Sequence, residues 1–545
     1  MGGLIFRFAF RSHGAIAQCN FDFGDRQRRG VAQRDELRRG EGIGKLAVIG
    51  QGKDSCRLSL SGDVARQIFV DAAQGPLIVD FLEVRPHRFQ ASFDLDADRQ
   101  GALDRLFDLL RFKSISTDPA FVGACAEAAD WLVEQLRSIG FEASSRPTAG
   151  HPMVVAKASA ARADAPHVLF YGHYDVQPVD PLDLWQTDPF APRVADAAPG
   201  RPQIVARGAA DDKGQLMTFV EACRAFRANG GLPCHVTILF EGEEESGSTS
   251  LPAFLAANGK ELKSDLMLVC DTNMWNRATP LITCMLRGLA LEEVTIRAAS
   301  RDLHSGMFGG AAVNPIHLLA KIIAGLHDEQ GRITLPDFYD GVPELPTDIK
   351  QQWDDLKVDE KAFLGEVGLS ESAGEAGYYL LEKIWARPTC DVNGITGGYQ
   401  GQGSKTVLPA QASAKFSFRL VGKQKPQEIV ENFRAYVKSC LPEDCEAEFV
   451  SHGASPALSL PFRSEAILRA SRALEAEWGK KTVLAASGGS IPIVGLFKRE
   501  LKMDSLMVGF GLDDDRIHSP NEKYELSSFQ KGARSWARIL QALAG

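Results

Sequence analysis

The chain has 545 residues, of which 44% are apolar and 24% charged, a globular composition on a length too great for a single core. Its net charge of −9 argues against a nucleic-acid partner, because phosphate binding needs a basic surface. No apolar run approaches the roughly 18 residues of a membrane span, and the ten cysteines include no C-x-x-C pair. We therefore expect a cytoplasmic protein of two or three domains with reduced thiols, binding neither nucleic acid nor membrane.

Residues 1–92 differ from the rest of the sequence, because they carry arginine clusters and little sustained apolar periodicity. We expect an N-terminal extension of unknown role: a disordered segment, a small appended domain, or sequence that is not part of the native protein. Globular structure is expected from Leu95 onward, where apolar residues recur at helical spacing over 102–110 and again over 126–139.

The central part of the chain alternates short apolar runs with a helical pattern. Runs that contain β-branched residues predict strands at 167–171, 235–240 and 266–270, and helical spacing predicts a helix at 215–228. Another strand is predicted at 506–510. This alternation is typical of an α/β fold with a mixed, mainly parallel sheet flanked by helices.

A segment with a different order of predicted strands and helices interrupts this α/β pattern. The segment from about 287 to 455 has its own succession of predicted strands and helices, and the run from Phe462 returns to the α/β pattern with a helix, a strand and a helix. The simplest architecture is one main domain with an inserted α+β domain. The predicted boundaries are 1–92 for the extension, 93–286 and 456–545 for the main domain, and 287–455 for the insertion.

Polar side chains follow several predicted strands, at the carboxyl ends where open α/β sheets bind their ligands. The strand at 168–171 leads to His173 and Asp175, and the strand at 236–240 leads into the acidic run 241–245. Adjacent carboxylates repel one another unless cations or solvent relieve them. Taken singly, the first pair can be a loop hydrogen bond, and the acidic run a solvated face. Asp211, just before the helix at 215–228, can be a helix-start acid favoured by the dipole.

Taken together, these segments offer a set of histidine and carboxylate ligands. Such a set suits zinc, and also manganese or cobalt, and the lack of cysteine argues against a closed structural zinc site. One ion would have too many ligands, whereas two ions about 3.5–4 Å apart, bridged by one carboxylate and a water, would use all five and leave a glutamate as general base. The candidates are His173, the acidic start of the helix at 215–228, a glutamate of the run 241–245, Asp271 and His518.

From about Leu95 to the C-terminus, these motifs resemble those of the dinuclear zinc peptidase family that includes carnosine dipeptidases, glutamate carboxypeptidase, acetylornithine deacetylase and succinyl-diaminopimelate desuccinylase. The resemblance implies that Asp211 bridges the two ions and that Asp175 orients His173. It also implies that Glu244 is the general base and that the peptide bond between Asp211 and Asp212 is cis. Glu245 and Asp271 would each hold one ion, and His518 would complete the second.

The same resemblance extends to the inserted domain, which it implies is a lid and dimerisation domain. The segment 302–310 is similar to one whose histidine reaches the partner subunit's active site, so His304 is expected to stabilise the oxyanion across a homodimer. Features of the dipeptidase branch suggest that Arg419 binds the free carboxylate of the substrate, with Gly489 and Ser490 as further donors. Without these motifs, His304 would be interpreted as a loop histidine and Arg419 as half of a surface ion pair.

The predicted function is therefore that of a metallodipeptidase acting on small peptides with a free C-terminal carboxylate. Glu244 would take a proton from water activated by two ions, most simply Zn²⁺ with Mn²⁺ or Co²⁺ as alternatives, and return it to the leaving amine. Closure of the inserted domain would gate the reaction.

Parts of the sequence suggest three other functions. An N-acyl amino acid deacylase on the same scaffold is disfavoured by the dipeptidase-like details around Arg419. A non-catalytic metal- or peptide-binding relative is disfavoured by Glu244, for which a pure binder has no need. A nucleotide-binding protein is suggested by 398–406, which nearly spells a phosphate loop, but one residue is out of place and Pro409 follows where a helix must start.

Overall fold

The computed structural model describes Leu95, residues 97–489 and residues 491–545, together with six strands nearer the N-terminus. The chain forms two compact units, Met1–Gln90 and Ala91–Gly545. In the first unit, two strands pair antiparallel and four others form an antiparallel sheet in the order β3-β4-β5-β6. Other residues of the 1–92 extension lie outside the described part, and its role and boundary stay predictions. The strands are β1 Ile5–Ser12, β2 Ala15–Asp22, β3 Asp35–Arg38, β4 Ile43–Gln51, β5 Ser55–Ser61 and β6 Arg66–Asp71.

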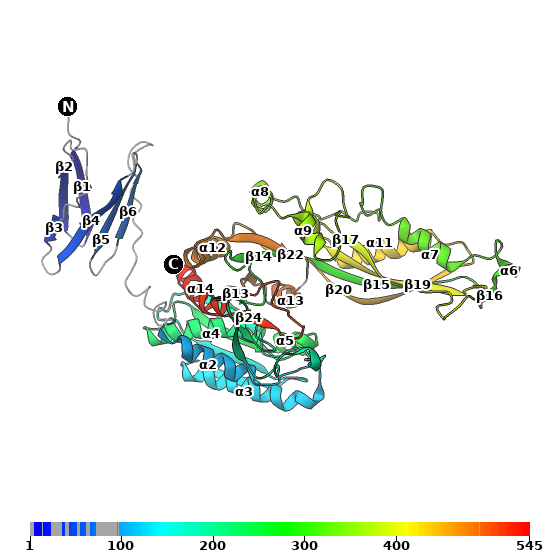
Figure 1. The fold of residues 1–545 in the computed structure, drawn as a ribbon, viewed down its shortest axis with the longest axis horizontal. Coiled ribbons are helices and arrows are strands. Elements are labelled where there is room, and N and C mark those ends of the chain that lie inside the picture. Colours follow the sequence, from blue (N-terminus) through cyan, green and yellow to red (C-terminus); the bar gives the residue numbers. More distant parts are fainter. Residues whose placement is uncertain are drawn as a thin grey trace. The chain divides into compact units, whose positions relative to one another are not determined.

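The second unit is built on a nine-stranded sheet in the order β21-β14-β23-β13-β9-β12-β8-β7, with β22 beside β14. Figure 1 labels β13, β14 and β22 of this sheet. Strands β23, β13, β9 and β12 are parallel, and β8 and β7 continue the sheet antiparallel. The carboxyl ends of the parallel strands therefore meet at one edge. The strands are β7 Glu142–Arg146, β8 Met153–Ala158, β9 His167–His173, β12 His235–Glu241, β13 Leu266–Val269, β14 Leu281–Leu286, β21 Leu458–Ser459, β22 Val483–Ser487 and β23 Asp504–Met507.

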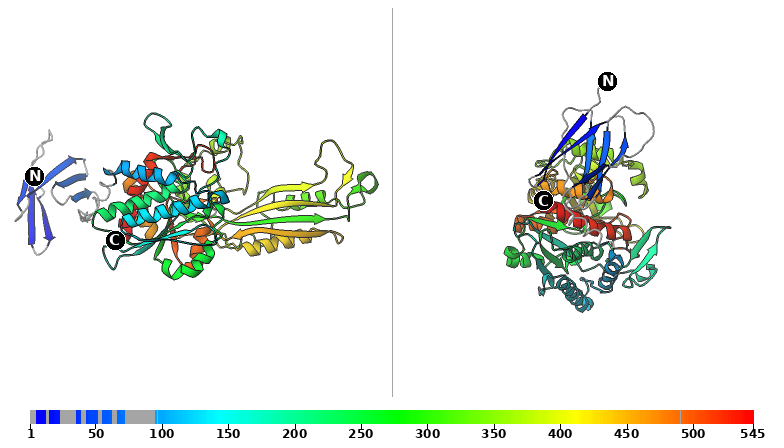
Figure 2. Two further views of the ribbon diagram at one scale, coloured as in Figure 1. Left: turned by 90° about the horizontal axis from the view of Figure 1, so that it is seen from below. Right: turned by 90° about the vertical axis from the view of Figure 1, so that its left-hand side faces the viewer.

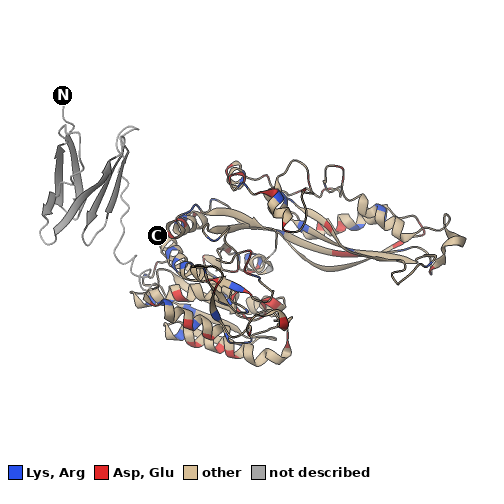
Figure 3. Cartoon of the chain, in the orientation of Figure 1, with Lys and Arg blue, Asp and Glu red and all other residues tan. Residues whose placement is uncertain are grey.

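Helices cover both faces of this sheet, because alternate residues of the central strand β9 pack in opposite directions. Phe170 stacks on Phe219 at 3.8 Å between ring centroids and meets Trp536 at 5.5 Å, whereas Tyr171 faces Phe497 at 6.0 Å. Acidic and basic residues are interspersed along these helices (Figure 3). The helices are α2 Arg99–Leu110, α3 Val122–Ser138, α4 Lys213–Ala228, α5 Leu251–Leu262, α12 Glu465–Trp478, α13 Pro492–Leu501 and α14 Leu526–Ala544.

Short elements complete this domain. A three-stranded sheet has the order β10-β11-β24. Along the chain, one 3-10 turn precedes α3, one precedes β10 and one follows β12. Their bounds are β10 Arg193–Asp196, β11 Pro202–Val205, β24 Lys523–Glu525, η1 Pro119–Phe121, η2 Leu182–Leu184 and η3 Glu244–Ser246.

The inserted segment has its own antiparallel sheet in the order β17-β19-β15-β20, whose long strands are also visible in Figure 2. We call this part the lid domain, after the role expected from the sequence. A separate hydrophobic core includes Phe416, Phe418 and Phe433, with α7 and α11 on the sheet. The elements are β15 Gly288–Arg297, β16 Leu303–His304, β17 Thr389–Gly397, β18 Val407–Leu408, β19 Gln411–Leu420, β20 Glu446–Ser455, α6 Ser305–Phe308, α7 Pro315–Ala324, α8 Thr347–Asp355, α9 Glu360–Gly365, α10 Leu380–Trp385 and α11 Pro426–Ser439.

The predicted fold class is confirmed: the sheet is mixed and mainly parallel, flanked by helices, and a second α+β layer is inserted. One strand differs from its prediction, because the run expected at 506–510 forms β23 at Asp504–Met507. Beyond it, Gly509 approaches the segment after β13 so closely that a Cβ there would overlap the carbonyl oxygens of Cys270 and Thr272. Within the described residues, no helix is long and apolar enough to cross a membrane.

Candidate active site

His173, the last residue of β9, is held in a fixed orientation by Asp175. The His173 Nδ1 atom lies 3.2 Å from the Asp175 carbonyl oxygen and 3.4 Å from its Oδ1. The carboxylate of Asp175 also accepts the backbone N–H of Glu244 at 3.3 Å and that of Glu245 at 3.0 Å. Both side chains of the pair are buried. Asp175 therefore joins the end of β9 to the acidic turn that follows β12, and it leaves His173 Nε2 free to face the site.

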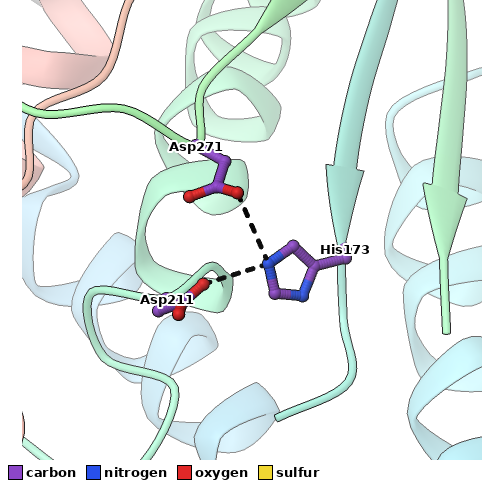
Figure 4. Close-up of side chains that lie close together, drawn as sticks. All are labelled: His173, Asp211 and Asp271. Atoms are coloured by element: carbon purple, nitrogen blue, oxygen red, sulfur yellow. Dashed lines mark hydrogen bonds and ion pairs between the residues drawn. The ribbon is translucent and has the colours of Figure 1, made fainter. Parts of the chain in front are cut away.

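Asp211 and Asp271 converge on that nitrogen (Figure 4). His173 Nε2 lies 3.0 Å from Asp211 Oδ1 and 4.0 Å from Asp271 Oδ2. Asp271 follows β13, and Asp211 precedes α4. The peptide bond between Asp211 and Asp212 is cis, as expected. These three residues form one group whose ligand atoms lie within 4.8 Å of one another.

A second group uses the other oxygen of Asp211. His518 Nε2 lies 2.9 Å from Asp211 Oδ2 and 3.4 Å from Glu245 Oε2. Asp211, Glu245 and His518 again offer ligand atoms within 4.8 Å of one another. Asp211 belongs to both groups, and each group also contains one histidine and one further carboxylate.

The electrostatics of the site fit divalent cations. Burial raises the pKa of Asp271 well above its usual value, and the charges of Asp211 and Asp212 act in the same direction. Burial also raises the pKa of Glu244, with His173 opposing the shift and Glu245 reinforcing it. Such crowding of carboxylates is relieved by positive charge, and the oxygen and imidazole donors suit zinc, manganese or cobalt.

Two supporting residues were missed by the sequence reasoning. The buried Glu522 accepts hydrogen bonds from Arg207 Nη1 at 2.8 Å and from the backbone N–H of Gly208, Ala210 and Asp211 at 2.9, 2.9 and 3.1 Å. It therefore fixes the segment that carries Asp211. Gln177 Nε2 donates to Glu245 Oε2 at 2.7 Å. Their only sequence signal is that Glu522 follows His518 by four residues and Gln177 follows Asp175 by two.

Glycines allow the close packing around Asp211. A Cβ on Gly172 would lie 2.9 Å from Asp212 Oδ2, and a Cβ on Gly214 would overlap the carbonyl oxygen of Ala209. The backbone at these positions therefore approaches the segment 209–212 more closely than a larger residue would permit.

Among the described residues, neither of these two groups includes His304, Arg419 or Gly489. His304 is exposed on β16, and its Nδ1 accepts the Gly306 N–H at 3.0 Å. Arg419 lies half-buried on β19, opposite Leu289 of β15. Gly489 donates its N–H to Ser487 Oγ at 3.1 Å. Ser490 falls outside the described residues, and the roles of all four residues stay predictions.

Comparison with known proteins identifies the family. Residues 169–542 match peptidase family M20/M25/M40. The chain belongs to this family. The Cys-Gly metallodipeptidase DUG1 of Saccharomyces cerevisiae is 29% identical over 82% of this chain and 96% of that protein. The Beta-Ala-His dipeptidase of Rattus norvegicus is 27% identical over 80% of this chain and 88% of its own.

A solved structure supports the same assignment. The M20 family metallo-carboxypeptidase Sso-CP2 from Sulfolobus solfataricus superposes with a TM-score of 0.68 at 29% identity, covering 81% of this chain and 99% of the other. The predicted family, fold and enzyme class are thus confirmed, and the chain is a metal-dependent peptidase.

Proposed function

We propose that this M20 peptidase hydrolyses dipeptides, or similar small peptides with a free C-terminal carboxylate, with the help of two zinc ions. The observation that carries the proposal is the sharing of Asp211 between two groups of ligands, with Glu244 beside them. It is supported by the names of relatives that align over most of their length, a Cys-Gly metallodipeptidase and a Beta-Ala-His dipeptidase.

In this proposal, His173, Asp211 and Asp271 would hold one ion, and Asp211, Glu245 and His518 would hold the other. When bound, the ions supply Lewis acidity that polarises the amide carbonyl and acidifies water. Mn²⁺ or Co²⁺ would suit the same donors.

Glu244 carries the proton in the proposed reaction. Its carboxylate takes a proton from water as the oxygen attacks the amide carbon, and returns that proton to the amine as the carbon–nitrogen bond breaks. Burial raises its pKa towards the range in which both transfers are favourable near neutral pH. Asp175 contributes indirectly, because it holds both the His173 ring and the backbone of Glu244.

The lid domain would contribute residues that bind the substrate and stabilise the oxyanion. Arg419 would bind the substrate carboxylate beside Gly489 and Ser490, and His304 of the partner subunit would stabilise the oxyanion in a homodimer. The role proposed for His304 is supported by its exposure on β16, three residues before Met307, which is 75% exposed. We place the protein in the cytoplasm because the eight cysteines within the described residues are all free.

A panel of substrates tests the proposed function. Chelator-stripped protein is assayed with Cys-Gly, β-Ala-His and N-acetyl amino acids before and after zinc or manganese is added back. Metal-restored cleavage of either dipeptide is expected. Cleavage of the N-acetyl amino acids alone would move the function to deacylation, and no turnover despite bound metal would make the chain a non-catalytic relative.

A further inference from the structure

Arg287 occupies the junction between the main domain and the lid. It is the single residue between β14 and β15, and its guanidinium is half-buried. The backbone N–H of Arg287 donates to the Gly489 carbonyl at 3.2 Å, and Nε donates to the Gly488 carbonyl at 2.9 Å. A Cβ on Gly488 would lie 3.0 Å from Arg287 Nη2. The guanidinium is therefore fixed against the segment that follows β22.

Arg419 lies on the neighbouring strand, and its charge acts on this guanidinium. It is directly opposite Leu289 in the pairing of β15 with β19, and Arg287 precedes Leu289 by the two residues that place side chains on one face. Arg287 and Arg419 are thus diagonal neighbours across the two paired strands. Burial lowers the pKa of Arg287 to about 10, and the charge of Arg419 adds to this shift.

The two positive charges have no anionic partner within the described part of the chain. Neither guanidinium has a carboxylate within ion-pair distance there. The acid whose charge acts on Arg287 is Asp391, which is exposed and accepts a hydrogen bond from Thr389 Oγ1 at 2.9 Å. A carboxylate between the two arginines would relieve their repulsion, and the Nη groups of Arg287 remain available as donors.

We propose that Arg287 acts with Arg419 as a two-arginine binding site for the C-terminal carboxylate of the peptide substrate. This inference rests on the proposed dipeptidase function and adds a residue that the sequence did not single out. The substrate carboxylate would contact Arg419 on the lid sheet and Arg287 at the domain junction. It would therefore hold the lid sheet and the Gly488–Gly489 segment together around the substrate. Selection for a free C-terminus then depends on both domains.

The test compares an acid with its amide. Steady-state kinetics are measured with Cys-Gly and with Cys-Gly amide for the wild type, Arg287→Gln and Arg287→Lys. For Arg287→Gln we expect KM for Cys-Gly to rise about 10- to 100-fold, the loss of a hydrogen bond to a charged group, with kcat changed less than about threefold. The kcat/KM for the amide should hardly change. Arg287→Lys should recover part of the loss. The matched control is Arg297→Gln, further along β15, where Arg297 is paired with Glu448 at the surface.

The outcomes separate the inference from the proposed function. If Arg287→Gln retains the wild-type preference for Cys-Gly over its amide, Arg287 does not bind the carboxylate. An equal loss on both substrates would assign Arg287 a purely structural role and also overturn the inference. If the metal-loaded wild type cleaves neither Cys-Gly nor the other peptides of the panel, the proposed function fails first and the inference falls with it.

Discussion

Replacing Glu522 with glutamine should weaken both the fold and the metal site. Glu522 Oε2 accepts hydrogen bonds from Arg207 and Gly208, and Oε1 accepts the N–H groups of Ala210 and Asp211. Glutamine has a donor NH₂ in place of one oxygen, so two of these donors lose their acceptor, and the buried Arg207 guanidinium loses its counter-charge. Removing one partner of a buried ion pair costs about 3–5 kcal/mol of unfolding free energy. Loss of a group that orients a metal ligand lowers metal affinity about 10- to 100-fold.

The assay pairs urea unfolding in chelator with zinc titration of the stripped protein. A matched control is Glu477→Gln on α12, because Glu477 accepts hydrogen bonds from Arg534 at 2.7 Å and Arg538 at 2.9 Å and belongs to neither metal group. The control should lose stability but keep its zinc affinity. If Glu522→Gln binds zinc as tightly as the wild type, Glu522 does not position Asp211, and the reasoning from its hydrogen bonds is wrong.

Three further substitutions test other parts of the structure. Glu244→Gln should keep its ions but lose about 10²–10⁴ in kcat. The control is Glu243→Gln, which should keep its turnover, because the Glu243 carboxylate only accepts the backbone N–H groups of His151 and Ser250. Equal losses in the two variants would show that Glu244 is not the general base. Burial raises the pKa of Glu241 from 4.5 to about 7, because the folded protein favours the neutral acid over the buried carboxylate. The stability that the neutral acid contributes is therefore fully present below about pH 4.5 and is lost as the pH rises to about 7. Glu241→Gln, which mimics the protonated acid, should flatten the fall in melting temperature across this window, and an unchanged slope would contradict the burial argument. Gly214→Ala should lower the melting temperature because its Cβ overlaps the Ala209 carbonyl oxygen, and a wild-type melting temperature would refute this.

The strand ends could be predicted from the sequence because their signals are local. The apolar runs at 167–171 and 235–240 correspond to β9 and β12, which extend only one or two residues further. Parallel pairing then carries His173, Glu245 and Asp271 to one edge of the sheet without any knowledge of the register. The acids and histidines that the sequence singled out as ligands are the ones that converge on Asp211.

The supporting contacts could not be predicted, because they join segments that are far apart in the chain. Glu522 reaches the backbone of Asp211 across 311 residues, and Arg287 reaches the Gly488 carbonyl across 201. No periodicity or motif encodes such pairs, since each depends on how loops at one sheet edge or domain junction fold together. The proximity of Arg287 to Arg419 could likewise not be predicted, because Arg287 carries no motif of its own and is brought near Arg419 only by the register of β15 with β19.

Calorimetric titration of chelator-stripped protein with zinc shows whether two metal ions share Asp211. The wild type should bind two ions per chain, with activity on Cys-Gly appearing as the sites fill, and Asp211→Asn should lose both high-affinity ions together. Binding of one ion only, or of two ions that survive the loss of Asp211, would contradict the bridged site.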